Sequence, residues 1–251
     1  MRRIGFLGCG KIGKALAGHL AGREDAVVEF IQDPGFVNDM GLRCQVISAA
    51  EEQAYARADL IVECATAPVL ADNLEMILAH CDLMMFSATA FGNQAFEGRA
   101  RALCGAYGRK IFIPHGAILG LDGIFDGGQI WNEVVIETTK SPKSLGRRDL
   151  RRTVVYEGTA REACALYPRN VNVHAAVALA GIGFDRTFSR IISDPETSAN
   201  THRIHLGGEG VSITLDISSF ADGAVTGAYT PCSACGSLDR VLENGAGVRF
   251  V

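Results

Sequence analysis

Three glycines near the start of the chain have the spacing of a turn that binds a dinucleotide. The segment Gly8-Cys9-Gly10-Lys11-Ile12-Gly13 follows the apolar run from Ile4 to Leu7 and precedes a helix-like stretch from Lys14 to Ala21. In this setting the first glycine permits a tight turn, the second lets the backbone approach a pyrophosphate, and the third lets helix and strand pack closely. The unpaired N–H groups at the helix start then face the phosphates. We predict that the turn binds a dinucleotide; the alternative is a glycine turn that binds nothing. The predicted contacts are Gly8, Gly10, Lys11, Ile12 and Gly13.

An acidic residue ends the second strand-like run. Ala26 to Gln32 is rich in β-branched and aromatic residues, and Asp33 follows it, about 20 residues after the glycine turn. A carboxylate there accepts hydrogen bonds from the ribose hydroxyls and repels a 2′-phosphate. We therefore predict a preference for NAD, with NADP as the second cofactor considered. The alternative is that Asp33-Pro34-Gly35 is merely a turn.

The first 114 residues alternate between strand-like and helix-like patterns. Further strands are expected at residues 42–47, 59–66, 82–86 and 110–113, with helices at 50–58, 69–80 and 91–107. Six strands alternating with helices predict an α/β fold, a doubly wound parallel sheet of the Rossmann type. Ligands of such sheets bind outside the carboxyl ends of the strands, which places Cys64, Ala65, Ser87 and Ala88 along the cofactor. Cys64 and Ser87 are also candidate nucleophiles, although neither has a base adjacent in sequence.

After Pro114 the pattern changes to that of an α+β unit. Strands are expected at 133–139, 152–157, 186–193, 202–206 and 211–218, and helices at 159–167 and 172–183. These predict an antiparallel or mixed sheet. Thr230 can cap a closing helix with Pro231 in its first turn, and this helix is expected to pack on the first domain. The predicted domains are residues 1–114 plus 230–251, and residues 115–229.

Composition excludes several classes of partner. The 251 residues carry a net charge of −4 and are 48% hydrophobic, as in an ordinary soluble globular protein, so we expect neither nucleic acid nor a membrane surface as partner. No apolar run approaches the roughly 18 residues of a membrane span, and the N-terminus enters a strand at once, so no signal peptide is expected. The eight cysteines, mostly single in apolar segments, favour reduced thiols in the cytoplasm. Cys232-Ser-Ala-Cys235 is interpreted as packing at a helix start, with incidental redox or metal chemistry as the alternative, and no metal site is predicted.

Three stretches of the second half carry a more specific pattern. They are Pro114-His-Gly-Ala-Ile-Leu-Gly-Leu-Asp-Gly123, Tyr167-Pro-Arg-Asn-Val-Asn-Val173 and Asn200-Thr-His-Arg-Ile204. With the N-terminal turn, they resemble the L-aspartate dehydrogenase family over essentially the whole chain, and Thr138-Thr-Lys-Ser-Pro142 matches less closely. The resemblance implies a Rossmann domain completed by the C-terminal helix, a substrate and dimerisation domain between, and a homodimer.

The same resemblance implies an activity and some of its residues. The activity is NAD(P)-linked oxidative deamination of L-aspartate through iminoaspartate, which hydrolyses to oxaloacetate or feeds NAD biosynthesis. Carried over by position, Ala117 and Asn172 match cofactor-contacting residues and His202 matches the proposed active-site histidine. The chain departs from the usual pattern at His115, where small residues are common, and at Lys140, in a stretch that often reads Thr-Arg-Lys-Pro. Thr230-Pro231-Cys232 also replaces the usual Asn-Pro-Lys.

Amino-acid oxidation requires a base and, for a dicarboxylate, cationic partners. A histidine with a pKa near neutrality can remove the ammonium proton and later a proton from water, and among the six histidines the resemblance favours His202. His205 should face the opposite way if the segment is extended, whereas His174 is a candidate substrate contact. Lysine and arginine suit carboxylates. The available cations are Lys140, Lys143, Arg169 and Arg203, of which Lys140 and Arg169 are favoured.

Two other functions share these features. A reductase of the dihydrodipicolinate type has the same two-domain plan, but its paired histidines followed by a lysine are absent here. A non-catalytic NAD-binding protein is the other alternative, and the retention of His202 and Asn172 argues against it.

Overall fold

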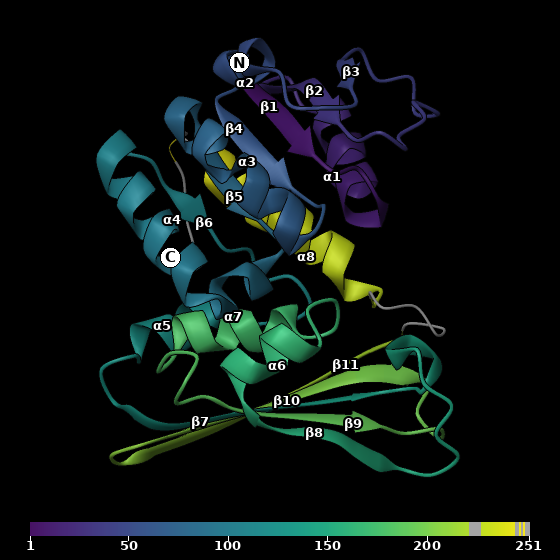
Figure 1. The fold of residues 1–251 in the computed structure, drawn as a ribbon, viewed down its shortest axis with the longest axis vertical. Coiled ribbons are helices and arrows are strands. Elements are labelled where there is room, and N and C mark those ends of the chain that lie inside the picture. Colours follow the sequence, from purple (N-terminus) through teal and green to yellow (C-terminus); the bar gives the residue numbers. More distant parts are fainter. Residues whose placement is uncertain (221–226, 244–245, 247, 249–251) are drawn as a thin grey trace. The chain divides into compact units, whose positions relative to one another are not determined.

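The structure is a computed structural model that describes residues 1–220, 227–243, 246 and 248. The chain divides into two compact units (Figure 1). Among the described residues, the first comprises Met1–Ala90, Gln94–Pro114 and those from Pro231 onward, and the second comprises Phe91–Asn93 and residues 115–220 and 227–230. The predicted domain ranges include residues 221–226, 244–245, 247 and 249–251, which lie outside the described residues.

The first unit is built on a six-stranded sheet in which every pairing is parallel. The strand order is β3-β2-β1-β4-β5-β6, so the order reverses between β1 and β4. Central strands are apolar and buried, as in β4, where all four residues are inaccessible to solvent. The predicted doubly wound α/β fold is confirmed. The strands are β1 (Arg2–Leu7), β2 (Ala26–Gln32), β3 (Gln45–Ile47), β4 (Leu60–Glu63), β5 (Asp82–Met85) and β6 (Ile111–Phe112). The helices are α1 (Lys11–Ala21), α2 (Glu52–Arg57), α3 (Ala67–His80) and α4 (Gln94–Tyr107). The helix predicted at residues 91–107 is divided in the structure between the end of a 3-10 turn, η1 (Ala88–Gly92), and α4.

The C-terminal helix α8 (Tyr229–Leu242) completes the core of the first unit. Its apolar residues Ala234, Leu238 and Leu242 are buried in the same cluster as β1 and α1, which confirms the predicted return. Asp239 also accepts a hydrogen bond from His19 Nε2 at 2.8 Å. The predicted cap was wrong, because α8 begins one residue before Thr230, whose buried Oγ1 has no partner in the described part of the chain.

The second unit contains a five-stranded mixed sheet in the order β11-β10-β7-β9-β8. Only β7 and β9 pair in parallel; the other pairings are antiparallel. Helices α5, α6 and α7 lie on one face of this sheet (Figure 1). The elements are α5 (Leu121–Asp126), β7 (Trp131–Lys140), η2 (Lys143–Leu145), β8 (Thr153–Thr159), α6 (Ala160–Leu166), α7 (Asn172–Ala180), β9 (Phe188–Ser193), β10 (Ala199–Gly208) and β11 (Val211–Phe220).

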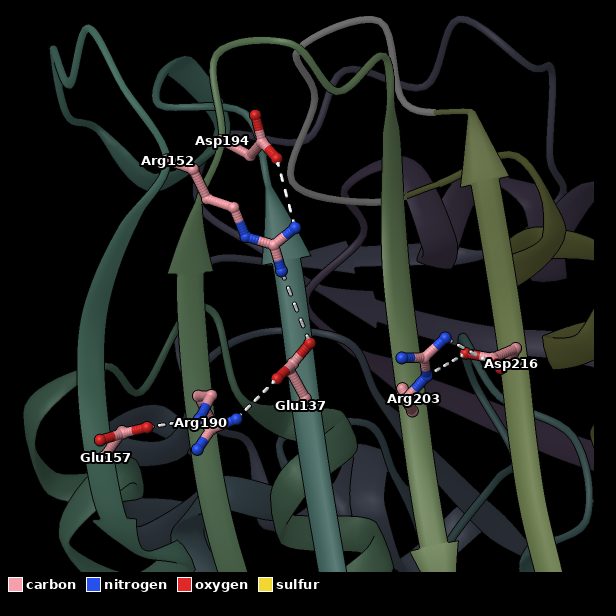
Figure 2. A network of polar contacts seen from close by, with 7 residues as sticks. All are labelled: Glu137, Arg152, Glu157, Arg190, Asp194, Arg203 and Asp216. Carbon is pink, nitrogen blue, oxygen red and sulfur yellow. Dashed lines mark hydrogen bonds and ion pairs between the residues drawn. The ribbon is translucent and has the colours of Figure 1, made fainter.

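The two faces of this sheet differ in chemistry. Alternate residues of β10 are buried beneath the helices, whereas Arg203 and His205 point to the uncovered face; the predicted opposition of His202 and His205 is confirmed. On the uncovered face each strand contributes one charged residue to a single row in register, with signs that alternate (Figure 2). Ion pairs join neighbours along most of the row. The row is Glu157, Arg190, Glu137, Arg203 and Asp216.

Candidate active site

The glycine turn has the conformation and the open space that a bound pyrophosphate requires. Gly8 adopts a φ of +81°, and a Cβ added there would lie 2.7 Å from the Cα of Ala65, so only glycine allows this approach of β1 to the loop after β4. A Cβ at Gly13 would lie 3.0 Å from the Gly8 carbonyl oxygen. At Gly10 the same atom would meet nothing within 4 Å. Helix α1 starts at Lys11, and its N-cap residue Gly10 makes no side-chain cap bond; the N-terminus of a helix suits an anion.

Asp33 ties the end of β2 to this turn. Its Oδ2 accepts a hydrogen bond from the Cys9 N–H at 2.8 Å, and its Oδ1 accepts one from the Gly35 N–H at 2.8 Å. A carboxylate offers about four lone-pair sites, so Asp33 retains acceptor capacity for ribose hydroxyls. The turn and the ribose interpretations are therefore compatible.

Glu63, which the sequence analysis did not identify, shapes the same edge of the sheet. It is fully buried at the end of β4. Its carboxylate accepts hydrogen bonds from the N–H groups of Ala65 (2.8 Å), Phe86 (3.2 Å) and Ser87 (2.9 Å) and from Ser87 Oγ (2.7 Å). Burial raises the pKa of Glu63, and these bonds oppose the rise. Glu63 thus holds together the loops after β4 and β5. A carboxylate closing an otherwise apolar strand was the available signal.

The predicted residues of these loops are suited to contact rather than to nucleophilic attack. Burial raises the pKa of the Cys64 thiol well above its ordinary value, so the thiolate is disfavoured. The Ser87 hydroxyl donates to Glu63. Ala65 is half-buried beside Gly8, and Ala88 is buried at the start of η1.

In the second unit, four polar side chains form a buried chain of hydrogen bonds on the covered face of the sheet. Thr138 on β7 lies opposite His202 on β10, and its Oγ1 is 2.8 Å from His202 Nδ1. The same Oγ1 is 2.6 Å from His174 Nε2 on α7, and His174 Nδ1 is 2.6 Å from Ser189 Oγ on β9. None of the four is more than 3% exposed. His174, predicted as a substrate contact, therefore has both ring nitrogens bonded within the protein.

Lys140 adds an unbalanced charge to this cluster. It follows Thr138 by two residues on the covered face of β7 and is only 4% exposed. No carboxylate of the described residues forms an ion pair with it. Burial lowers the pKa of Lys140 to about 8. Burial, and then the charge of Lys140, lower the pKa of His202 to about 3, so the His202 imidazole is neutral at neutral pH.

The other predicted contacts are distributed around the second unit. Ala117 is half-buried in the turn that follows His115, and Asn172 is the first residue of α7. Arg169 is exposed in the turn before α7. Arg203 pairs with Asp216 on the uncovered face at 2.7 Å, away from His202. Of the four cations considered, Lys140 is the one that shares the covered face and electrostatic contact with His202.

A pocket is lined mainly by polar residues that are close in sequence to Lys140 and His202. It has a volume of about 490 Å³ and lies in the second unit. Its walls continue from Lys140 at the end of β7 and include the first residues of β10, just before His202. Two of the lining side chains are cationic, although Arg147 already bonds Asp149. The pocket is lined by Ser141, Pro142, Lys143, Ser144, Arg147, Pro195, Thr197, Ser198, Ala199 and Asn200.

Two features are not found within the part of the chain that the structure describes. No cluster of three or more histidine, cysteine or acidic residues could hold a metal ion. No helix among these residues is long and apolar enough to cross a membrane.

The fold and these residues define a dinucleotide-dependent oxidoreductase. The family model for the aspartate dehydrogenase C-terminal domain matches residues 126–241, and the model for the NAD-binding domain of homoserine dehydrogenase matches residues 8–114. L-aspartate dehydrogenase 1 of Bordetella pertussis is 37% identical over 217 residues, covering 82% of this chain and 83% of that protein. The L-aspartate dehydrogenase of Methanosarcina mazei is 32% identical and covers 97% and 98%, respectively. The chain belongs to the aspartate dehydrogenase family.

Solved structures agree with this assignment. The aspartate dehydrogenase of Thermotoga maritima superposes with a TM-score of 0.82 at 26% identity over 100% of both chains. A dihydrodipicolinate reductase from a Paenisporosarcina species gives a TM-score of 0.54 at 12% identity, over 96% of this chain and 93% of that chain. The latter likeness shows the fold alone, so the family resemblance is confirmed and the reductase alternative gains no support for its chemistry.

The neutral burial of His202 predicts a pH dependence of stability. Its folded pKa of about 3 lies below the ordinary value near 6.5, so the unfolded chain binds the proton first as the pH falls. The unfolding free energy therefore falls as the pH decreases from about 6.5 toward 3. At pH 5 the loss due to His202 is about 2 kcal/mol. The unfolding free energy, measured by urea denaturation, should fall between pH 7.5 and pH 5 in both the wild type and His202→Gln. The fall should be about 2 kcal/mol smaller in His202→Gln than in the wild type. His205→Gln, on the uncovered face, is the matched control. Equal losses in wild type and His202→Gln would contradict the neutral burial.

Proposed function

We propose that this protein catalyses the oxidative deamination of L-aspartate to iminoaspartate, which hydrolyses to oxaloacetate and ammonia, with a nicotinamide dinucleotide as oxidant. The observation that carries the proposal is the juxtaposition of Lys140, a buried cation without a carboxylate partner among the described residues, with His202 on one covered face. Membership of the aspartate dehydrogenase family supports the choice of substrate.

Lys140 supplies the charge that a dicarboxylate needs. A buried cation is costly unless it is paired, and a substrate carboxylate would be the missing partner. Burial is the larger cause of the low pKa of His202 and the charge of Lys140 is the second; a carboxylate bound beside Lys140 offsets the second cause. The substrate thereby makes His202 a stronger base at the moment when a base is needed. Arg169 is the second proposed carboxylate contact, because it is exposed in the turn before α7 and forms no ion pair with described residues.

His202 performs the two proton transfers. No described residue hydrogen-bonds its Nε2, since the recorded bond is made by Nδ1. Nε2 takes a proton from the substrate ammonium, and the amine lone pair then forms the C=N bond as the α-carbon loses hydride. The same imidazole, after releasing that proton, removes one from the water that attacks the imine carbon. The dinucleotide, when bound, accepts the hydride.

Cofactor contacts are assigned in each unit separately. In the first unit, the open backbone at Gly10 and the uncapped start of α1 fit a pyrophosphate, and Asp33 fits the ribose diol. From the second unit, Ala117 and Asn172 are assigned by their match to the family pattern. The full set is Gly8, Gly10, Lys11, Ile12, Gly13, Asp33, Cys64, Ala65, Ala88, Ala117 and Asn172.

NADH formation across a panel of amino acids tests the proposed reaction. Wild-type protein should oxidise L-aspartate in preference to the other amino acids. His202→Ala should lower kcat at least about 100-fold, the usual contribution of a general base, and leave the Kd for NAD within about twofold, as no cofactor contact is assigned to it. His205→Ala is the control on the same strand and should keep wild-type turnover. Oxidation of another amino acid but not of aspartate would contradict the substrate assignment.

The position of Asp33 predicts that NAD is preferred over NADP. Its carboxylate would repel a 2′-phosphate, so kcat/KM should be at least about tenfold higher with NAD, one unfavourable charge contact being of the order of 1.4 kcal/mol. Asp33→Ala should narrow this ratio, whereas Asp25→Ala, at an exposed carboxylate that precedes β2 and pairs with Arg23, should leave it unchanged. A higher kcat/KM with NADP in the wild type would overturn the ribose argument.

The family resemblance also leads us to propose a homodimer in the cytoplasm whose product can feed NAD biosynthesis. The uncovered face of the second sheet supports the dimer, because Val154, Phe188 and Phe220 expose large apolar side chains there. The eight free cysteines suit a reducing compartment. A solution mass equal to the 26.7 kDa of one chain would contradict the dimer.

A further inference from the structure

The hydrogen bonds behind His202 have a direction that decides whether it can act as a base. Thr138 Oγ1 bonds both His202 Nδ1 and His174 Nε2, but a hydroxyl carries one hydrogen. Thr138 therefore donates to one imidazole and accepts from the other. The hydrogens of the whole chain, from His202 to Ser189, can run in only two directions.

Only one direction leaves a lone pair on His202 Nε2. In that direction His202 Nδ1–H donates to Thr138, Thr138 O–H donates to His174 Nε2, and His174 Nδ1–H donates to Ser189 Oγ. In the reverse direction His202 carries its proton on Nε2 and can only donate there. All members stay neutral in both directions, as their complete burial requires.

We propose that Thr138, His174 and Ser189 are positioning residues that hold His202 in the Nδ1–H tautomer and so direct a basic Nε2 towards the substrate. The hydrogen bonds allow both directions, and the choice between them rests on the proposed dehydrogenase function, because only an unprotonated Nε2 can take the substrate proton. The role assigned to His174 is thus support of His202 through Thr138, in place of the predicted substrate contact. The titratable groups that face His202 in this arrangement are Lys140 on β7 and His174 on α7.

We call the chain of hydrogen bonds from His202 through Thr138 and His174 to Ser189 the relay. It acts by fixing the tautomer of His202 and not by accepting the proton, because burial lowers the pKa of His174 well below its ordinary value and so disfavours a charged His174.

Long-range ¹H–¹⁵N NMR of the imidazoles tests the tautomer directly. In ligand-free wild-type protein at neutral pH, His202 should appear as the Nδ1–H tautomer. Thr138→Ser keeps the hydroxyl and should keep this spectrum. Thr138→Val has the same shape without the hydroxyl, so its His202 should become a mixture of the two tautomers. If His202 of the wild type carries its proton on Nε2, the proposal is wrong, and this result alone decides it.

Turnover with aspartate supplies the second measurement. Thr138→Val should lower kcat by about 10- to 100-fold, as misdirecting a base does, and should move the acidic limb of the pH profile while the KM for NAD stays unchanged. Thr138→Ser should restore both. Thr139→Val, on the adjacent residue that faces the uncovered side, is the matched control and should behave as the wild type.

The two measurements separate failure of the relay from failure of the proposed function. If Thr138→Val turns over aspartate as the wild type does, with an unchanged pH profile, the positioning role is wrong. If the wild type does not oxidise aspartate, the proposed function fails. The NMR spectrum of ligand-free protein still shows whether Thr138 fixes the tautomer of His202. Should Thr138→Val not fold, Ser189→Ala removes the far end of the chain, and an unchanged kcat and His174 spectrum in that variant would count against the relay.

Discussion

A positive charge buried without a carboxylate partner in the described chain is the constraint on which the account of this site depends. Lys140 lies on the covered face of the second sheet, where burial lowers its pKa. Burial also lowers the pKa of His202, and the charge of Lys140 lowers it further. A buried charge without a partner is energetically unfavourable. A bound anion neutralises it, so the residue that recognises the substrate carboxylate also influences the pKa of His202.

Backbone geometry, in contrast, prepares the cofactor edge. Gly8 and Gly13 allow close packing, Gly10 leaves open space, and Glu63 gathers four donors to hold the loops after β4 and β5. These arrangements need no ligand to be stable. The first unit therefore offers a preformed surface for a dinucleotide, and the second unit contains the buried charge of Lys140, to which we assign the substrate carboxylate.

Local patterns sufficed to predict the first unit, because G-x-G-x-x-G and Asp33 act within one strand–turn–helix segment and the next strand. The pairing of Thr138 with His202 could not be read this way, since it depends on the register of two strands 64 residues apart. Nor could the sequence indicate that His174 is enclosed or that Lys140 lacks a counter-ion, as both follow from helix packing over the sheet. The predicted cap at Thr230 failed because α8 extends one residue further.

Proton uptake on binding of a non-oxidisable dicarboxylate tests the central claim about Lys140. Calorimetry of succinate binding at pH 8, in buffers of different ionisation enthalpy, counts the protons taken up. Because Lys140 has a pKa of about 8 and a carboxylate raises it, wild-type protein should take up as much as about 0.5 proton per succinate. Lys140→Met should take up none and bind at least about tenfold more weakly, the loss expected for a buried charge-assisted contact. Binding without proton uptake in the wild type, with equal affinity in Lys140→Met, would contradict the account.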